Sequence, residues 1–202
     1  MSNAMITARQ TAAYLMRLAF DEVEPAYLTH LHVHKLLYYV QGWSLAIRGV
    51  QVFSDPIVAW KHGPVVCELY GQLKSYGDSP ITDFNLLEAD GIDGNDRFMI
   101  ASVWERYKNF SAMFLRSMTH RERPWLNARQ GIPPDVNKNV EITCDSMKEF
   151  FTMQLDKSTA PVRTKVDWNQ NPDNNNQLDD KFLEAVQSVF ITDAELLKRL
   201  AS

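Results

Sequence analysis

The chain has 202 residues, of which 45% are hydrophobic and 23% are charged, and its formal net charge is −4. This composition is typical of a soluble globular protein with one well-buried core and room for an appendage. The negative charge argues against general nucleic-acid binding, and no apolar run approaches the roughly 20 residues that cross a bilayer. No signal peptide follows Met5, so we expect a cytoplasmic protein without a membrane partner.

The first helix is predicted at about residues 8–20. Residues 1–4 are typical of a cloning scar, so the folded chain is expected to begin at Met5. Thr7 and Gln10 have the spacing of a capping box, in which each side chain satisfies a backbone N–H at the helix start. Apolar residues then recur at helical spacing and predict one buried face.

A second helix, around Lys35–Ile47, is predicted to be the centre of the domain. Apolar residues cover nearly its whole circumference, so other elements should surround it. Thr29 is the expected N-cap, and Gly49 is the expected left-handed residue after the helix. Gly42 predicts that a neighbouring backbone approaches closely. A narrow polar stripe is left, formed by His34, Gln41, Ser44 and Arg48.

The chain after Gly49 changes character. Residues 50–60 are rich in β-branched and aromatic side chains and contain Asp55-Pro56, which predicts extended chain or a short irregular hairpin. Pro64 suits the first position of a third helix, which Gly77 would end.

Charge is segregated in the next segments. Residues 78–96 hold six acidic side chains and no lysine or arginine, whereas residues 97–138 hold eight basic side chains against three acidic ones, a net +5. Such segregation can steer a charged partner, although a solvated face is the commoner explanation.

Further helices are predicted over about residues 97–107, after a Ser111 cap, and from Pro124 to near Gly131. A last domain helix is expected after an Asp145 cap, with Met147, Phe150 and Phe151 facing inward. The fold class is therefore mainly α, a compact multi-helix domain around a buried central helix.

The composition breaks after this domain. We expect the helical domain at 5–155, a linker at 156–179 that is Asn-rich over 167–179, and an amphipathic helix at 180–202. Apolar side chains three or four residues apart would form one stripe on that last helix, at Phe182, Val186 and Phe190 among others.

The histidines offer few catalytic or metal-binding patterns. On a helix only His30 and His34 share a face, His32 lies elsewhere, and neither a third ligand nor an H-E-x-x-H motif is present, so we expect no metal and no cofactor. His62 and His120 lie in loop-like segments, where binding residues concentrate. The same loops fit a purely structural role, and no catalytic motif is recognised, so no catalytic residue is assigned.

Four ordered motifs resemble one known family. They are KLLYYVQGWSLA at 35–46, AW-x-x-GPVV at 59–66, LY and YG at 69–70 and 76–77, and TH-x-E-x-PW at 119–125. Together they resemble the Panacea domain, also called the SocA-like antitoxin or phage-associated protein family, over roughly residues 6–155.

The resemblance implies a bacterial or phage antitoxin that binds and neutralises a cognate protein toxin, and a homo-oligomer stays open. Alternatives are an adaptor that delivers a client protein to a protease, or an enzyme of unidentified activity. Because aromatic and arginine side chains anchor protein interfaces, they dominate the candidate site. The candidate partner-binding residues are Trp60, His62, His120, Arg121, Arg123, Trp125, Arg129, Phe182, Val186 and Phe190.

Overall fold

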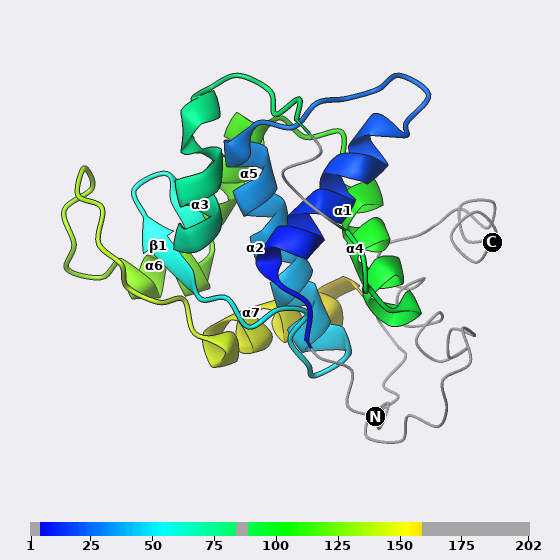
Figure 1. The fold of residues 1–202 in the computed structure, drawn as a ribbon. Coiled ribbons are helices and arrows are strands. Elements are labelled where there is room, and N and C mark those ends of the chain that lie inside the picture. Colours follow the sequence, from blue (N-terminus) through cyan, green and yellow to red (C-terminus); the bar gives the residue numbers. More distant parts are fainter. Residues whose placement is uncertain (1–4, 84–88, 159–202) are drawn as a thin grey trace.

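The computed structural model describes residues 5–83 and 89–158, and within these ranges the chain is mainly helical, as predicted (Figure 1). A single two-stranded antiparallel sheet accompanies the helices in this described part. The elements in chain order are α1 (Ala8–Phe20), α2 (His30–Ile47), β1 (Ile57–Trp60), β2 (Gly63–Val66), α3 (Cys67–Leu73), the 3₁₀ turn η1 (Lys74–Tyr76), α4 (Gly94–Tyr107), α5 (Ala112–Thr119), α6 (Arg123–Ala128) and α7 (Cys144–Ser158).

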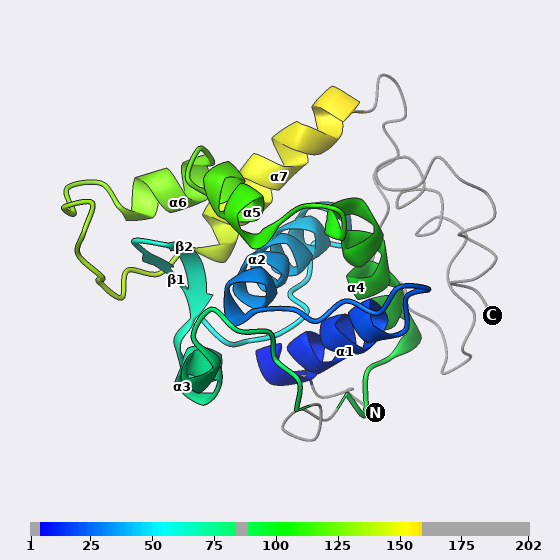
Figure 2. The same cartoon turned by 90° about the horizontal axis from the view of Figure 1, so that it is seen from above.

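Helix α2 is the centre of the fold. Figure 2 shows α1 and α4 on one side of it and α5, α6 and α7 on the other, and α2 contacts α1, α4, α5, α7 and β2. Fourteen of its 18 residues are buried, which confirms the predicted enclosure. Its ends are also as predicted, because the Thr29 side chain accepts the backbone N–H of His32 and Gly49 adopts a φ of 73°.

Gly42 makes room for a side chain of another helix. The prediction that a neighbouring backbone approaches it closely was wrong. A Cβ added at Gly42 would lie 2.1 Å from Cε2 of Phe151, so the aromatic ring from α7 occupies the place of the missing side chain. Phe151 is 1% exposed and packs edge-on against Trp43 with ring centroids 5.1 Å apart.

Two residues of the polar stripe of α2, Gln41 and Ser44, bind the irregular segment that follows the helix. The Gln41 side chain donates to the Phe53 carbonyl at 2.8 Å and accepts the Val52 N–H at 3.0 Å. Ser44 Oγ donates to the Val50 carbonyl at 2.8 Å. These side chains give hydrogen-bond partners to backbone groups of residues 50–53, which lie outside the helices and strands. Gln41 and Ser44 are therefore buried with their own polar groups bonded as well.

The hairpin lies later in the chain than expected. Strand β1 pairs with β2 in the register Ile57↔Val66 to Trp60↔Gly63, so Pro64 stands inside a strand and the prediction that it opens a helix was wrong. The helix α3 begins only at Cys67. The reason is pairing, since the β-branched Val65 and Val66 follow Pro64 directly and are placed opposite β1.

The remaining helices follow their predicted order with shifted ends. The Thr7–Gln10 capping box of α1 is confirmed, as is the Ser111 cap of α5. Helix α4 begins at Gly94, three residues earlier than predicted, because Asp93 accepts the N–H of Asp96. The predicted Asp145 cap of α7 was wrong.

The cap of α7 lies two residues earlier. Thr143 Oγ1 accepts the N–H of Ser146 at 3.2 Å, and the helix begins at Cys144. Met147 and Phe151 are buried and Phe150 is half-buried, so the predicted inward face is confirmed.

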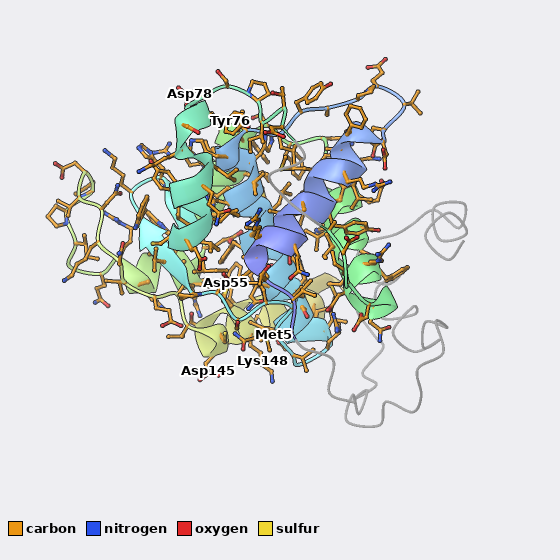
Figure 3. All side chains as sticks on the ribbon, in the orientation of Figure 1. Met5, Asp55, Tyr76, Asp78, Asp145 and Lys148 are labelled. Carbon is orange, nitrogen blue, oxygen red and sulfur yellow. The ribbon has the colours of Figure 1, made fainter. Side chains whose placement is uncertain are left out.

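The start of α1 is fixed from a distant part of the chain. The Asp55 carboxylate accepts the backbone N–H of Ala8 at 2.9 Å, and Asp55 lies close to this helix start in Figure 3. An acid at a helix N-terminus also opposes the positive end of the helix dipole.

No helix in the described residues is long and apolar enough to cross a bilayer. The predicted linker beyond 158 and the amphipathic helix at 180–202 lie outside the described residues, and the proposed domain boundaries stay predictions.

Candidate partner-binding site

The structure brings together the two loop segments that the sequence marked. The β-hairpin lies against the start of α6, where Trp125 Nε1 donates to the carbonyl of Trp60 at 2.9 Å. The His120 ring stacks on Trp125, with centroids 4.1 Å apart and planes 8° from parallel. Five predicted site residues, Trp60, His62, His120, Trp125 and Arg129, therefore belong to this one region.

Arg129 lies at the base of this region and is 7% exposed. Its guanidinium donates to the carbonyls of Ala59, Val136, Pro133 and Pro134 at 2.6–3.4 Å. These bonds use up most of its donors, so its side chain holds the 133–136 loop against β1 and has little left for a partner.

Trp60 is tied to the loop before α7. Its Nε1 donates to Asn139 Oδ1 at 2.7 Å, and its ring packs edge-on against Tyr70 with centroids 4.8 Å apart. The backbone N–H of Lys61 donates to Asn137 Oδ1 at 3.0 Å. The hairpin turn is thereby held from both sides.

Lys35 lies directly beneath the turn and was not identified from the sequence. It is fully buried, and its Nζ donates to the Pro64 carbonyl at 2.8 Å. Burial, aided by the nearby charge of Arg116, lowers the pKa of Lys35 to about 7. A Cβ at Gly63 would lie 2.8 Å from this Nζ, and Gly63 has a φ of 99°, so glycine is required there on both grounds.

The titratable groups around Lys35 are basic. Burial and then the charges of Arg116, Lys35, His62 and Arg129, in that order of size, together lower the pKa of His120 to about 4. Partial burial lowers the pKa of the exposed His62, and Arg116, Lys61 and Lys35 act in the same direction. The site therefore gathers basic groups, of which the Arg116 guanidinium keeps its charge at neutral pH, in an otherwise acidic protein.

Glu122 lies in the same motif but faces the core. Its Oε1 accepts the hydroxyl of Tyr39 at 3.0 Å. Burial raises the pKa of Glu122 to about 7, although the hydroxyls of Tyr38 and Tyr39 oppose that rise. The acid of the motif thus joins the α5–α6 turn to α2 and does not neutralise the basic groups.

The other histidines do not converge. His34 Nδ1 accepts the backbone N–H of Val66 at 3.4 Å, while His32 Nε2 lies 2.9 Å from the Phe110 carbonyl. The rings of His30 and His34 are 6.1 Å apart. In residues 5–83 and 89–158, no group of three or more His, Cys, Asp or Glu side chains could hold a metal ion.

A second surface feature lies on α5 and went unnoticed in the sequence. Phe110, Met113 and Phe114, which we term the α5 patch, are 37%, 59% and 50% exposed. The rings of Phe110 and Phe114 contact each other with centroids 4.9 Å apart. The signal that could have revealed the patch is the helical spacing of 110, 113 and 114, while the buried face of α5 is formed by Leu115 and Thr119.

The other predicted site residues are accounted for as follows. Arg121 and Arg123 are exposed and lie in the turn between α5 and α6 and at the start of α6. Phe182, Val186 and Phe190 lie outside the described residues.

Comparison with known proteins finds one family that matches part of the chain. Residues 33–126 match the family described as antitoxin SocA-like, Panacea domain. The match is shorter than the resemblance in the sequence and includes most of α2, the hairpin and the motif at 119–125. No curated protein and no solved structure matches significantly. Residues 33–126 are thus similar to the Panacea domain of the SocA-like antitoxin family.

Proposed function

We propose that the protein is an antitoxin that neutralises a cognate toxin by binding it directly. The observation that carries this proposal is the family match, which spans both motif loops and the helices between them. The description of the family names it antitoxin-like. An antitoxin that neutralises its toxin by direct contact needs an interaction surface and no reaction centre.

The contact surface we propose comprises the α5 patch with Arg121 and Arg123. Aromatic, methionine and arginine side chains are the types enriched at protein interfaces. Met113 and Phe114 leave half or more of their surface exposed, although apolar side chains of this size are usually buried in a monomer. The net +5 of residues 97–138 favours a partner surface that is acidic.

The test is co-expression with the product of the neighbouring reading frame. Met113→Ser combined with Phe114→Ser should abolish both copurification and growth rescue, while the fold stays intact by circular dichroism. Val23→Ser is the matched control, since Val23 is 96% exposed and lies in the α1–α2 connection. Full rescue by the double variant would reject this surface, and the absence of any toxic neighbouring product would favour the adaptor alternative.

A further inference from the structure

Four basic side chains meet where the hairpin turn covers α2. They are Lys35 of α2, His62 of the β1–β2 turn, Arg116 of α5 and His120 at the end of α5, and we call them the cationic cluster. The charges of Lys35, Arg116 and His62 each lower the pKa of His120. Lys61 from the turn and Arg129 after α6 add positive charge at its edges.

The cationic cluster lacks a counter-ion among the described residues. Arg116 makes no ion pair and no side-chain hydrogen bond with them, and its Nε is buried without a partner. His120 Nε2 is likewise buried and without a partner. Buried polar nitrogens are nearly always bonded, and the Arg116 guanidinium is charged, so these two atoms in one cluster indicate a missing acceptor.

The nearest acid in sequence does not fill this role. Glu122 lies two residues after His120, but its carboxylate accepts the Tyr39 hydroxyl and is buried among tyrosines. Lys35 is fully buried beneath the turn, and its Nζ donates to the Pro64 carbonyl. The donors left for an added group are Arg116 and the His120 imidazole, whose plane is held by stacking on Trp125.

We infer that the cationic cluster binds an oxyanion through Arg116 and His120, and that a carboxylate of the protein partner supplies it. The exposed His62 marks the side from which such a group enters. A carboxylate offers the planar pair of acceptors that a guanidinium recognises best. The claim that the protein partner supplies the carboxylate rests on the proposed antitoxin function, whereas the claim that the cluster binds an oxyanion does not.

The first experiment uses the isolated full chain and inorganic phosphate as the probe. The His120 imidazole is followed by NMR across the acid range, in chloride with and without phosphate. Because a bound anion favours the imidazolium, we expect the His120 titration midpoint to rise by about one pH unit or more with phosphate. An unchanged midpoint would overturn the inference.

Two variants make the result specific. Arg116→Gln should abolish the phosphate-dependent rise, whereas Arg123→Gln, an exposed arginine outside the cluster, should retain it. His62→Asn changes an exposed side chain, so it keeps the test available even where Arg116→Gln fails to fold, and it should reduce the rise. A rise retained in both cluster variants would place the phosphate elsewhere and overturn the inference.

The second experiment identifies the source of the oxyanion. Addition of the toxin should raise the His120 midpoint as phosphate does, and phosphate should compete with the toxin. The His120 midpoint could respond to phosphate while Arg116→Gln leaves toxin binding unchanged. That result would overturn the assignment to a partner carboxylate and leave a site for free phosphate. Failure of the wild-type chain to bind any toxin would reject the proposed function, while the first experiment still decides whether the oxyanion site exists.

Discussion

The ring of Phe151 on α7 lies where a side chain at Gly42 of α2 would be, with Cε2 only 2.1 Å from the Cβ position. The Phe151 ring therefore packs on α2 in a position that only a glycine at residue 42 permits. Helix α7 is the last described element, so this contact joins the end of the domain to its centre.

We expect Gly42→Ala to destabilise the protein by about 1–3 kcal/mol, since the added methyl group forces the packed ring to move. Urea unfolding followed by circular dichroism measures the effect. Gly71→Ala is the control, because nothing lies within 4 Å of its Cβ position in α3. That change should be neutral or stabilise by up to about 1 kcal/mol. Equal midpoints for the two variants would contradict the close packing of α7 on α2.

Trp43→Ala should cost about 3–5 kcal/mol, because the truncation leaves a large cavity in the core. Trp43 is 3% exposed, and its Nε1 donates to the Tyr107 hydroxyl at 2.9 Å, so that hydroxyl also loses a partner. The free energy of unfolding is obtained from urea titration. Met113→Ala on the exposed face of α5 serves for comparison and should change it little. A Trp43→Ala variant that melts with the parent would mean that α2 is not enclosed.

Lys35 predicts how stability depends on alkaline pH. Its pKa falls to about 7 in the fold, from 10.5 in the unfolded chain. Between these values the unfolded chain binds one more proton, so stability rises with pH, by at most about 1.4 kcal/mol per pH unit. Lys35→Met should remove this rise between pH 7 and 10. An identical slope in the variant would show that Lys35 stays charged in the fold.

Glu122 predicts the opposite sign in the acid range. Its pKa is raised from 4.5 to about 7, so between these values the folded chain binds the extra proton and stability falls as pH rises. Glu122→Gln, which keeps the shape and stays neutral, should remove that fall. The measurement is the difference between the stability–pH curves of the parent and the variant. His120 contributes to stability with the opposite sign at pH 4–6.5, and its contribution is the same in both proteins, so it cancels in the difference. A flat difference curve would contradict the buried carboxylate.

Deletion of residues 180–202 should leave a folded domain with weakened toxin binding. The described residues between Ile6 and Phe151 form one hydrophobic core among themselves, so we expect the melting temperature to stay near that of the full chain. The triple change of Phe182, Val186 and Phe190 to serine should weaken binding as the deletion does. Full neutralisation by the shortened chain would reject a toxin contact by this segment.

Local signals in the sequence predicted most of the helical fold. The capping box of Thr7 with Gln10, the Thr29 and Ser111 caps and the enclosed α2 all depend on residues close in the chain. Their spacing alone determines which backbone groups are satisfied and which faces are apolar. The two motif loops could also be recognised from the sequence, although the residues that they contact in the fold could not.

Tertiary structure decided what pairs with what. Pro64 reads locally as a helix start, but pairing with β1 makes it part of a strand. Arg129 reads as an exposed interface anchor, yet its donors are used by carbonyls brought to it by the hairpin and the 133–136 loop. Lys35 reads as the polar end of an apolar run, and only the turn folded over it makes it a buried cation. Sequence spacing determines local hydrogen bonds and faces, whereas burial and electrostatics depend on segments that are distant in the chain, which only the folded structure brings together.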